Sequence, residues 1–177
     1  AGLSGCDTVP IYCQGYIDDF MGVALGRKCA EAHCDLVRGI AKALGFPLKE
    51  EKTERPTRKL EVLGADVDLD TAVAKLGLSK VEKYSAAIDA ALSNRSILRS
   101  ELETLVARLV YAAQFIPVGR SWLVCGFAAS AMAARKGQTR VRIGHGLRRE
   151  LSWWRTTLGS APGVAFFPKA DFTDVAA

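Results

Sequence analysis

Two apolar runs that flank a short polar segment constrain the fold of this chain more than any other feature. They lie within residues 9–25, and the polar segment between them covers residues 14–19. Apolar runs on either side of a polar turn predict a β-hairpin. The predicted tip carries Asp18 and Asp19 side by side. The chain is therefore predicted to present two adjacent carboxylates at one end of a small sheet.

Helical and strand-like patterns alternate after this hairpin. Apolar residues recur along one helical face from about Arg27 to Leu44, and Gly45 ends the pattern. Residues 46–48 predict a short strand. Residues 60–69, which surround a Leu63-Gly64 pair, predict another strand or hairpin.

The remainder of the chain is predominantly helical in pattern. Two pairs, Ser79 with Glu82 and Ser100 with Glu103, match the capping box and predict two helix starts. The apolar stripes of these two helices are Val81, Tyr84, Ile88 and Leu92, and then Leu102, Leu105, Leu109 and Ala113. Further helices are predicted from about residue 121 to 135 and from about 147 to 159, with extended segments at 137–143 and 164–175.

This order of elements predicts an α+β fold in three parts. Residues 1–72 are predicted to be rich in strands, residues 73–160 to form a helical bundle, and residues 161–177 to add a terminal strand. The boundary between the first two parts is predicted near residues 71–77.

Positive charge is concentrated in one half of the chain. The formal net charge is +5, and no acidic residue lies between Glu103 and Glu150. The basic residues of that stretch are Arg108, Arg120, Arg135, Lys136, Arg140, Arg142, Arg148 and Arg149. Such a distribution favours an anionic partner such as nucleic acid. Arg140 and Arg142 alternate on an extended segment and would track phosphates from one side, although a solvated basic edge gives the same pattern.

Cysteine usage and hydropathy restrict the compartment. Five cysteines without paired short spacings favour an intracellular, reducing compartment, with nucleus, cytoplasm and organelle all left open. The longest apolar run, residues 122–134, is too short to cross a bilayer and predicts a buried helix. The sequence opens with Ala rather than Met, which favours a processed product or a fragment.

The paired aspartates have a specific chemical use. Adjacent carboxylates repel each other. Neighbouring side chains in a straight strand point to opposite faces, whereas a tight turn lets both carboxylates face the same site. Mg²⁺ prefers oxygen ligands and commonly shares them with substrate phosphates. The sequence therefore predicts a Mg²⁺ site at Asp18 and Asp19, with a solvated Asp-Asp turn as the alternative.

The order of these motifs resembles that of reverse transcriptases. Tyr-Ile-Asp-Asp at residues 16–19 resembles the third palm motif of that family. The helix ending at Leu44, followed by Gly-Phe-Pro-Leu and Lys52, is similar to the next motif, and Leu63-Gly64 is similar to the hairpin that grips the primer end. Residues 116–120 and 151–154 resemble the thumb and connection of retrotransposon enzymes. Residues 172–176, with Asp174, resemble the first strand of a ribonuclease H domain.

The resemblance implies roles for particular residues. Asp18 would bind metal directly, with Asp19 in support, in a two-metal nucleotidyl transfer. Lys52 would stabilise the departing pyrophosphate, or else be a solvated lysine among neighbouring glutamates. The template-primer would be bound by the basic half, with Arg120, Arg140, Arg142, Arg148 and Arg149 as the candidate contacts.

Departures from the family pattern imply an incomplete catalyst. The family places a further metal-binding Asp well upstream, yet only 15 residues precede Tyr16 here, and Asp7 has no apolar strand around it. We therefore expect a polymerase fragment that needs an upstream palm segment, or a protein partner, to cover its open palm. The alternative is a domesticated, inactive remnant that serves as a structural or interaction subunit of a larger assembly, such as a ribonucleoprotein. A third reading is an unrelated α+β domain with a chance Tyr-Ile-Asp-Asp.

Three other side chains have competing interpretations. His33 lies on the apolar face of its helix, which favours packing over metal binding. Trp154 fits the apolar stripe of the last helix and is predicted in the core. Trp153 is left open between packing and stacking on a nucleic-acid base.

Overall fold

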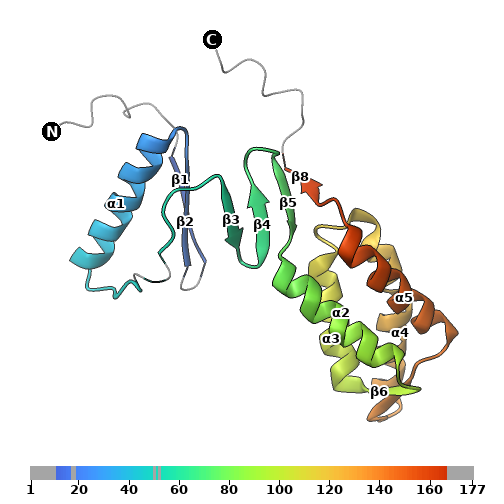
Figure 1. Ribbon diagram of the computed structural model, residues 1–177. Helices are drawn as coiled ribbons and strands as arrows, with labels where there is room; N and C mark the ends of the chain where they lie inside the picture. The colour runs from blue at the N-terminus through green and yellow to red at the C-terminus, as the bar shows by residue number, and fades with distance from the viewer. Residues whose placement is uncertain (1–10, 17–18, 50, 52, 167–177) are drawn as a thin grey trace. The chain divides into compact units, whose positions relative to one another are not determined.

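The computed structural model describes residues 11–16, 19–49, 51 and 53–166, and its fold is α+β as predicted (Figure 1). The chain divides into two compact units, residues 1–57 and residues 58–177. None of the helices in the described part of the chain combines the length and apolar content needed to cross a membrane.

The first unit contains the predicted hairpin and helix, and both predictions are confirmed. Strands β1 (Ile11–Tyr16) and β2 (Asp19–Ala24) pair antiparallel, with Tyr16 opposite Asp19. Helix α1 (Arg27–Ala43) packs against β2. The ring of His33 lies close against Gly22, so the packing interpretation of this histidine is confirmed.

The predicted strand at residues 46–48 is wrong, because this segment completes the end of α1 instead. Phe46 N donates to Ala41 O at 2.9 Å, and Gly45 N donates to Lys42 O at 3.2 Å. Gly45 has φ +75°. These two bonds and the left-handed glycine form a Schellman motif. The amide of Phe46 is thus used by the helix end and not by a strand ladder.

The second unit begins with a four-stranded antiparallel sheet in the order β3-β4-β5-β8. Strands β3 (Lys59–Val62) and β4 (Ala65–Asp68) confirm the predicted hairpin. Strand β5 (Val73–Leu76) occupies the segment where the sequence placed a boundary, and β8 (Val164–Ala165) returns to pair with it. The division between units therefore falls at residues 57 and 58 and not near 71–77. The sheet belongs with the helices.

Among the described residues, four α-helices follow strand β5, as the apolar patterns predicted. They are α2 (Leu78–Leu92), α3 (Arg99–Ala112), α4 (Val124–Arg135) and α5 (His145–Ser160). A 3₁₀-helix at Pro117–Trp122 delays the start of α4 by three residues relative to the prediction. The extended segment at 137–143 contains β7 (Arg140–Arg142), whose partner β6 (Ser96–Leu98) was not predicted.

Both predicted capping boxes are wrong, although helices begin close to each. Helix α2 begins at Leu78, and the carbonyl of its N-cap Gly77 accepts from two amides at 3.0 Å. Helix α3 begins at Arg99, and Glu101 Oε2 accepts from Leu98 N at 3.2 Å. Each N-cap lies two residues before the predicted serine, so Ser79 and Ser100 fall inside the first turn of their helices and cannot cap them.

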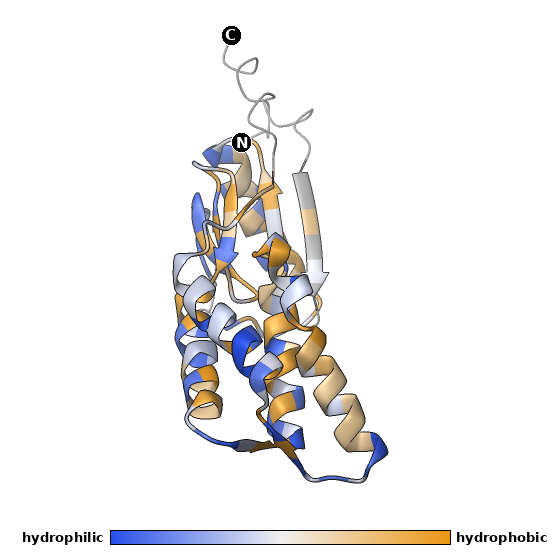
Figure 2. Cartoon of the chain, turned by 90° about the vertical axis from the view of Figure 1, so that its right-hand side faces the viewer, coloured by the Kyte–Doolittle hydropathy of each residue, from blue (hydrophilic) through white to orange (hydrophobic). Residues whose placement is uncertain are grey.

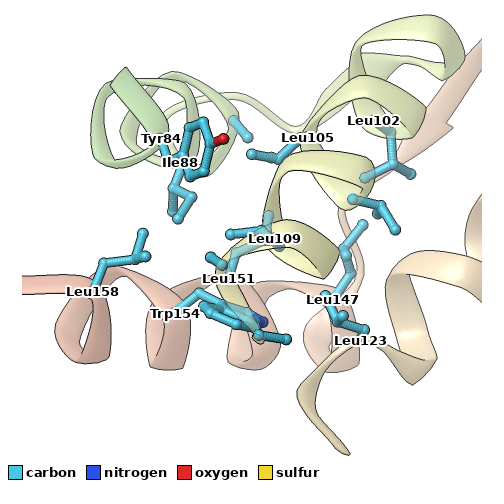
Figure 3. Packing of buried hydrophobic residues seen from close by; sticks show 14 of the residues in the cluster. Tyr84, Ile88, Leu102, Leu105, Leu109, Leu123, Leu147, Leu151, Trp154 and Leu158 are labelled. Atoms are coloured by element: carbon cyan, nitrogen blue, oxygen red, sulfur yellow. The ribbon is translucent and has the colours of Figure 1, made fainter. Parts of the chain in front are cut away.

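The core of the second unit lies between the helices. Trp154, Ile88, Leu102 and Leu109 are almost completely buried, which confirms the predicted stripes and the core position of Trp154. In Figure 3 the labelled side chains of α2, α3 and α5 converge in the space between these helices. Burying one such side chain stabilises a fold by about 1.5–3 kcal/mol.

Helix α4 differs from the prediction of a buried helix. Val124, Phe127 and Met132 are each more than half exposed. Gly126 and Ala133 are its buried residues. One face of α4 is therefore apolar and open to solvent.

Candidate nucleic-acid interface

The predicted metal site lies largely outside the described residues. The backbone of Asp19 pairs with Tyr16 at the end of the β1–β2 ladder. Asp18, Lys52 and Asp174 all fall outside the described residues. Across residues 11–16, 19–49, 51 and 53–166, no three His, Cys, Asp or Glu side chains form a group that could hold a metal. The Mg²⁺ site thus stays a prediction from the sequence, where two carboxylates supply suitable oxygen donors.

The Leu63-Gly64 pair forms the tight turn between β3 and β4. Val62 pairs with Ala65, and the two residues between them have φ +52° and φ +80°. Positive φ at both central positions is typical of a type I′ turn, which suits the twist of a hairpin. The side chain of Leu63 is about half exposed. The sequence thus predicted the hairpin around Leu63-Gly64, and the structure adds that these two residues form its turn.

Two helices hold this turn by one carbonyl oxygen. Leu63 O accepts from Lys80 Nζ at 2.8 Å and from Tyr111 Oη at 2.9 Å. Lys80 Nζ also lies 4.1 Å from the centroid of the Tyr111 ring. Sequence reasoning missed both residues, because they lie 17 and 48 positions from Leu63 and share no motif with it.

Some of the arginines predicted to contact nucleic acid are hydrogen-bonded within the protein, and others are not. The guanidinium of Arg148 donates to Leu92 O at 2.7 Å and Asn94 O at 3.3 Å. Arg140 donates to the hydroxyl and the carbonyl of Ser96, both at 3.1 Å. Arg148 therefore satisfies carbonyls at the end of α2, and Arg140 holds β6 against β7.

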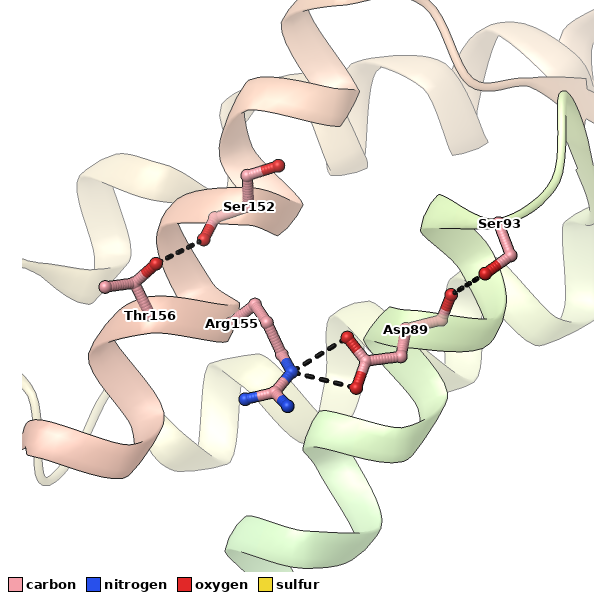
Figure 4. Close-up of polar contacts among 5 residues, drawn as sticks. All are labelled: Asp89, Ser93, Ser152, Arg155 and Thr156. Atoms are coloured by element: carbon pink, nitrogen blue, oxygen red, sulfur yellow. Dashed lines mark hydrogen bonds and ion pairs between the residues drawn. The ribbon is translucent and has the colours of Figure 1, made fainter.

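A further arginine outside the predicted set is also engaged. Arg155 Nε lies 2.8 Å and 2.9 Å from the two carboxylate oxygens of Asp89 (Figure 4). Both side chains are about half exposed. This pair joins α5 to α2, so Arg155 contributes to packing between helices and not to a free cationic surface.

Arg142, Arg120 and Arg149 are the more available candidates. Arg142 is exposed on β7, on the same side as Arg140, while Val141 between them is buried. No hydrogen bond or ion pair engages the Arg120 or Arg142 side chain within the part of the chain that the structure describes. Arg149 lies over the ring of Trp122, with Cζ 5.9 Å from the centroid. Figure 2 shows hydrophilic residues on the turns flanking the β6–β7 ribbon.

The tryptophans beside Arg149 are packed against one another. Trp122 and Trp153 stack with centroids 4.9 Å apart and planes 2° from parallel. Trp154 Nε1 donates to Trp122 O at 2.7 Å. Trp153 also lies edge-on to Trp154, with centroids 5.2 Å apart, and is partly buried against the core. These contacts favour packing, and stacking on a base stays a prediction from the sequence.

One face of the sheet is unsuited to phosphate. Glu61, Asp66 and Asp68 line a shallow depression there with Lys59 and Lys75. Lys59 Nζ lies 3.0 Å from Asp68 Oδ2. This hydrogen-bonded contact lowers the pKa of the Asp68 carboxyl, which keeps it ionised. Carboxylates on this face would repel a nucleic-acid backbone, so the arginines of the helical part are the better candidates.

A buried glutamate that the sequence did not single out organises the start of α4. Glu150 is 7% exposed, and its two carboxylate oxygens accept from Cys125 N at 2.7 Å and Gly126 N at 2.9 Å. Burial raises the pKa of the Cys125 thiol, and the charge of Glu150 adds to the effect. The available signal was the place of Glu150 between Leu147 and Leu151 in an apolar stripe.

The cysteines differ in state. Cys29 is disulfide-bonded, whereas Cys13, Cys34 and Cys125 are free thiols. The expectation of a reducing compartment therefore rests on cysteine spacing alone and draws no support from Cys29.

No protein-family model, curated protein or solved structure matches this chain. The functional assignment consequently depends on the order of the motifs and on the geometry described above.

Proposed function

We propose that this chain is part of an RNA-directed DNA polymerase of the reverse-transcriptase type and that its helical part binds template-primer. Nucleotidyl transfer would use Asp18 and Asp19 with Mg²⁺, and it would require an upstream palm segment. When bound, paired Mg²⁺ ions would activate the primer hydroxyl and stabilise the leaving phosphate. The ribonuclease H-like role of Asp174 and the intracellular compartment are parts of the same proposal.

One observation carries the proposal. A Tyr-Ile-Asp-Asp hairpin, a helix and a Leu-Gly hairpin occur in that order, and the Leu-Gly turn is attached to a helical bundle. Each of these elements is common by itself. Their combination supports a polymerase, because the family needs a carboxylate hairpin and a primer-gripping turn in one chain.

Arginine chemistry supports nucleic acid as the partner. Arg142 and Arg120 are exposed without carboxylate partners among the described residues, and Arg149 has only a ring beside it. Guanidinium groups bind phosphate oxygens in a bidentate manner and release condensed counterions. Binding of this kind weakens steeply as salt concentration rises.

A binding experiment tests the proposal. Fluorescence anisotropy would compare a labelled DNA primer recessed on an RNA template with the same sequences as a blunt hybrid. We expect the recessed end to bind at least about fivefold more tightly, because the Leu63-Gly64 turn would engage the primer terminus. Equal affinity for the two substrates, or no binding at low salt, would contradict the proposal.

A second function is favoured by exposed apolar side chains in the first unit. Leu36 and Ile40 of α1 and its C-cap Leu44 are spaced four residues apart and are 60%, 51% and 67% exposed. Phe46 is 62% exposed. Apolar surface of this kind is usually covered by a partner. The covering element would be an upstream palm segment in a polymerase. It would be another subunit in a domesticated remnant that serves a ribonucleoprotein assembly.

The proteins that co-purify with the native gene product distinguish these two functions. If the apolar stripe is covered by the same polypeptide, the Leu36→Glu and Ile40→Glu double variant unfolds or aggregates. If another subunit covers it, the variant stays folded and that subunit is lost from the purified complex.

A further inference from the structure

We infer that Lys80 and Tyr111 are positioning residues that fix the Leu63-Gly64 turn on α2 and α3, so that the turn meets the primer terminus in one register. The inference rests on the proposed function, because it assigns a ligand to the turn. It adds two residues that no motif identifies.

The contacts converge on a single atom from two different helices. Lys80 comes from the first turn of α2, and Tyr111 comes from the last turn of α3. Their donors lie 2.8 Å and 2.9 Å from Leu63 O. A carbonyl oxygen has two lone pairs. Both hydrogen-bonding positions of this oxygen are therefore filled by side chains of the bundle.

The hydrogen-bonding needs of Leu63 O do not by themselves require these two side chains. Water can satisfy an exposed turn carbonyl nearly as well as a protein donor does. Lys80 is instead held between an uncharged oxygen and the Tyr111 ring, and no carboxylate forms an ion pair with it within the described residues. Two side chains therefore donate hydrogen bonds to Leu63 O, although water could donate them instead.

The turn itself is adapted to the contact. Gly64 has φ +80°, and a Cβ at this position would collide with the end of the Lys80 side chain. Gly64 O accepts from Gly77 N, at the N-cap of α2, at 3.1 Å. Backbone and side-chain contacts therefore tie the same turn to the start of α2.

These contacts fix the position of the Leu63-Gly64 turn relative to α2 and α3. Leu105 and Leu109 of α3 are buried in the main core, so that the element carrying Tyr111 is itself held firmly. The side chain of Leu63 remains about half exposed. A ligand that touches Leu63 would consequently be fixed relative to the arginines of the same unit.

Site-specific crosslinking tests the inference. Leu63 would be replaced by the photoreactive residue benzoylphenylalanine in the full chain, which would then be irradiated on a recessed DNA primer annealed to an RNA template. The matched variants are Lys80→Met, which keeps the side-chain stem, and Tyr111→Phe, which keeps the ring. Lys83→Met, on an exposed lysine of the same helix, controls for the loss of one charge.

We expect crosslinks at the last one or two primer nucleotides in the parent chain and in Lys83→Met. In Lys80→Met and Tyr111→Phe, the fraction of crosslinks at those nucleotides should fall at least about threefold, with affinity changed less than about twofold. An unchanged crosslink pattern in both variants would overturn the positioning role and leave the proposed function intact. Failure of the parent chain to bind template-primer would contradict both the proposed function and the inference that rests on it.

Hydrogen exchange without nucleic acid separates positioning from general stabilisation. We expect Lys80→Met and Tyr111→Phe to accelerate amide exchange in the β3–β4 hairpin at least about fivefold, with exchange in the middle of α3 unchanged. Equal acceleration in α3 would show that the two residues only stabilise the fold, and it would overturn the inference.

Discussion

At the scale of single residues, the carboxylate of Glu150 on α5 joins that helix to the first backbone amides of α4. The first amides of a helix have no partner inside that helix, and Glu150 on α5 supplies acceptors to two of them on α4. A carboxylate near the positive end of a helix dipole is also favoured electrostatically. The tertiary contact thus replaces a local cap, since Leu123 has no side-chain acceptor.

Replacing Glu150 by Gln should destabilise the second unit. The variant keeps one acceptor oxygen but places an amide donor against a backbone N–H, and an unsatisfied buried donor costs about 1–3 kcal/mol. Urea unfolding measures the change. Glu103→Gln is the matched control, because Glu103 is half exposed and should change stability by less than about 0.5 kcal/mol. Equal effects of the two substitutions would contradict the capping role of Glu150.

Gly64 should be far less tolerant of alanine than Gly159. Gly64→Ala places a side chain at positive φ, which costs about 1–2 kcal/mol, and it also displaces Lys80. Gly159 lies in α5 with nothing near its missing Cβ, so Gly159→Ala should raise stability by up to about 1 kcal/mol. Thermal unfolding of the two variants gives shifts of opposite sign if the turn geometry is correct. Shifts of the same sign would refute it.

At the scale of elements, the arginines of one short stretch have separate tasks. Arg148 binds the carbonyls that end α2, whereas Arg142 is exposed on β7 without a partner among the described residues. Both arise from the same basic region of the sequence. Their roles are distinguished only by the fold.

Alanine substitution should separate these two tasks. Arg148→Ala should lower stability by about 1 kcal/mol, because two carbonyls lose a charged donor. Arg142→Ala should change the free energy of unfolding by less than about 0.5 kcal/mol. It should weaken template-primer binding and make the slope of log affinity against log salt concentration shallower by about one phosphate contact. Anisotropy titrations at several salt concentrations, together with urea unfolding, check both expectations. Lower affinity without lower stability in Arg148→Ala would reverse the assignment.

The elements were more predictable from the sequence than their contacts. Periodic apolar positions such as Ile88 and Leu109 identified the helices because one face must be buried. The three-residue strand β6 is too short to give a periodic signal. The serine caps failed for another reason, since the chain enters each helix two residues earlier, at Gly77 and Leu98, and both serines then lie in the first turn.

The candidate site followed the same division. The Leu63-Gly64 turn was predictable because adjacent residues make it, and positive φ at Gly64 is a local property. Lys80 and Tyr111 were not predictable, since their contacts depend on how two helices pack. Long-range geometry of this kind leaves no pattern in a single sequence.

At the scale of the whole molecule, the two units differ in how they bury apolar surface. The second unit has a continuous core formed by sheet and helices. In the first unit, Leu36 and Leu44 of the α1 region are mostly exposed. The proposed polymerase palm would have this surface covered by another segment.

Primer extension by the native gene product tests the polymerase assignment most directly. The product would be isolated through an epitope on this chain and given an RNA template, a DNA primer, nucleotides and Mg²⁺. We predict template-directed extension that disappears in the Asp18→Asn and Asp19→Asn double variant, with template-primer affinity retained. A product that binds template-primer but does not extend it, with or without the substitutions, would contradict the polymerase assignment and favour a remnant kept for its surfaces.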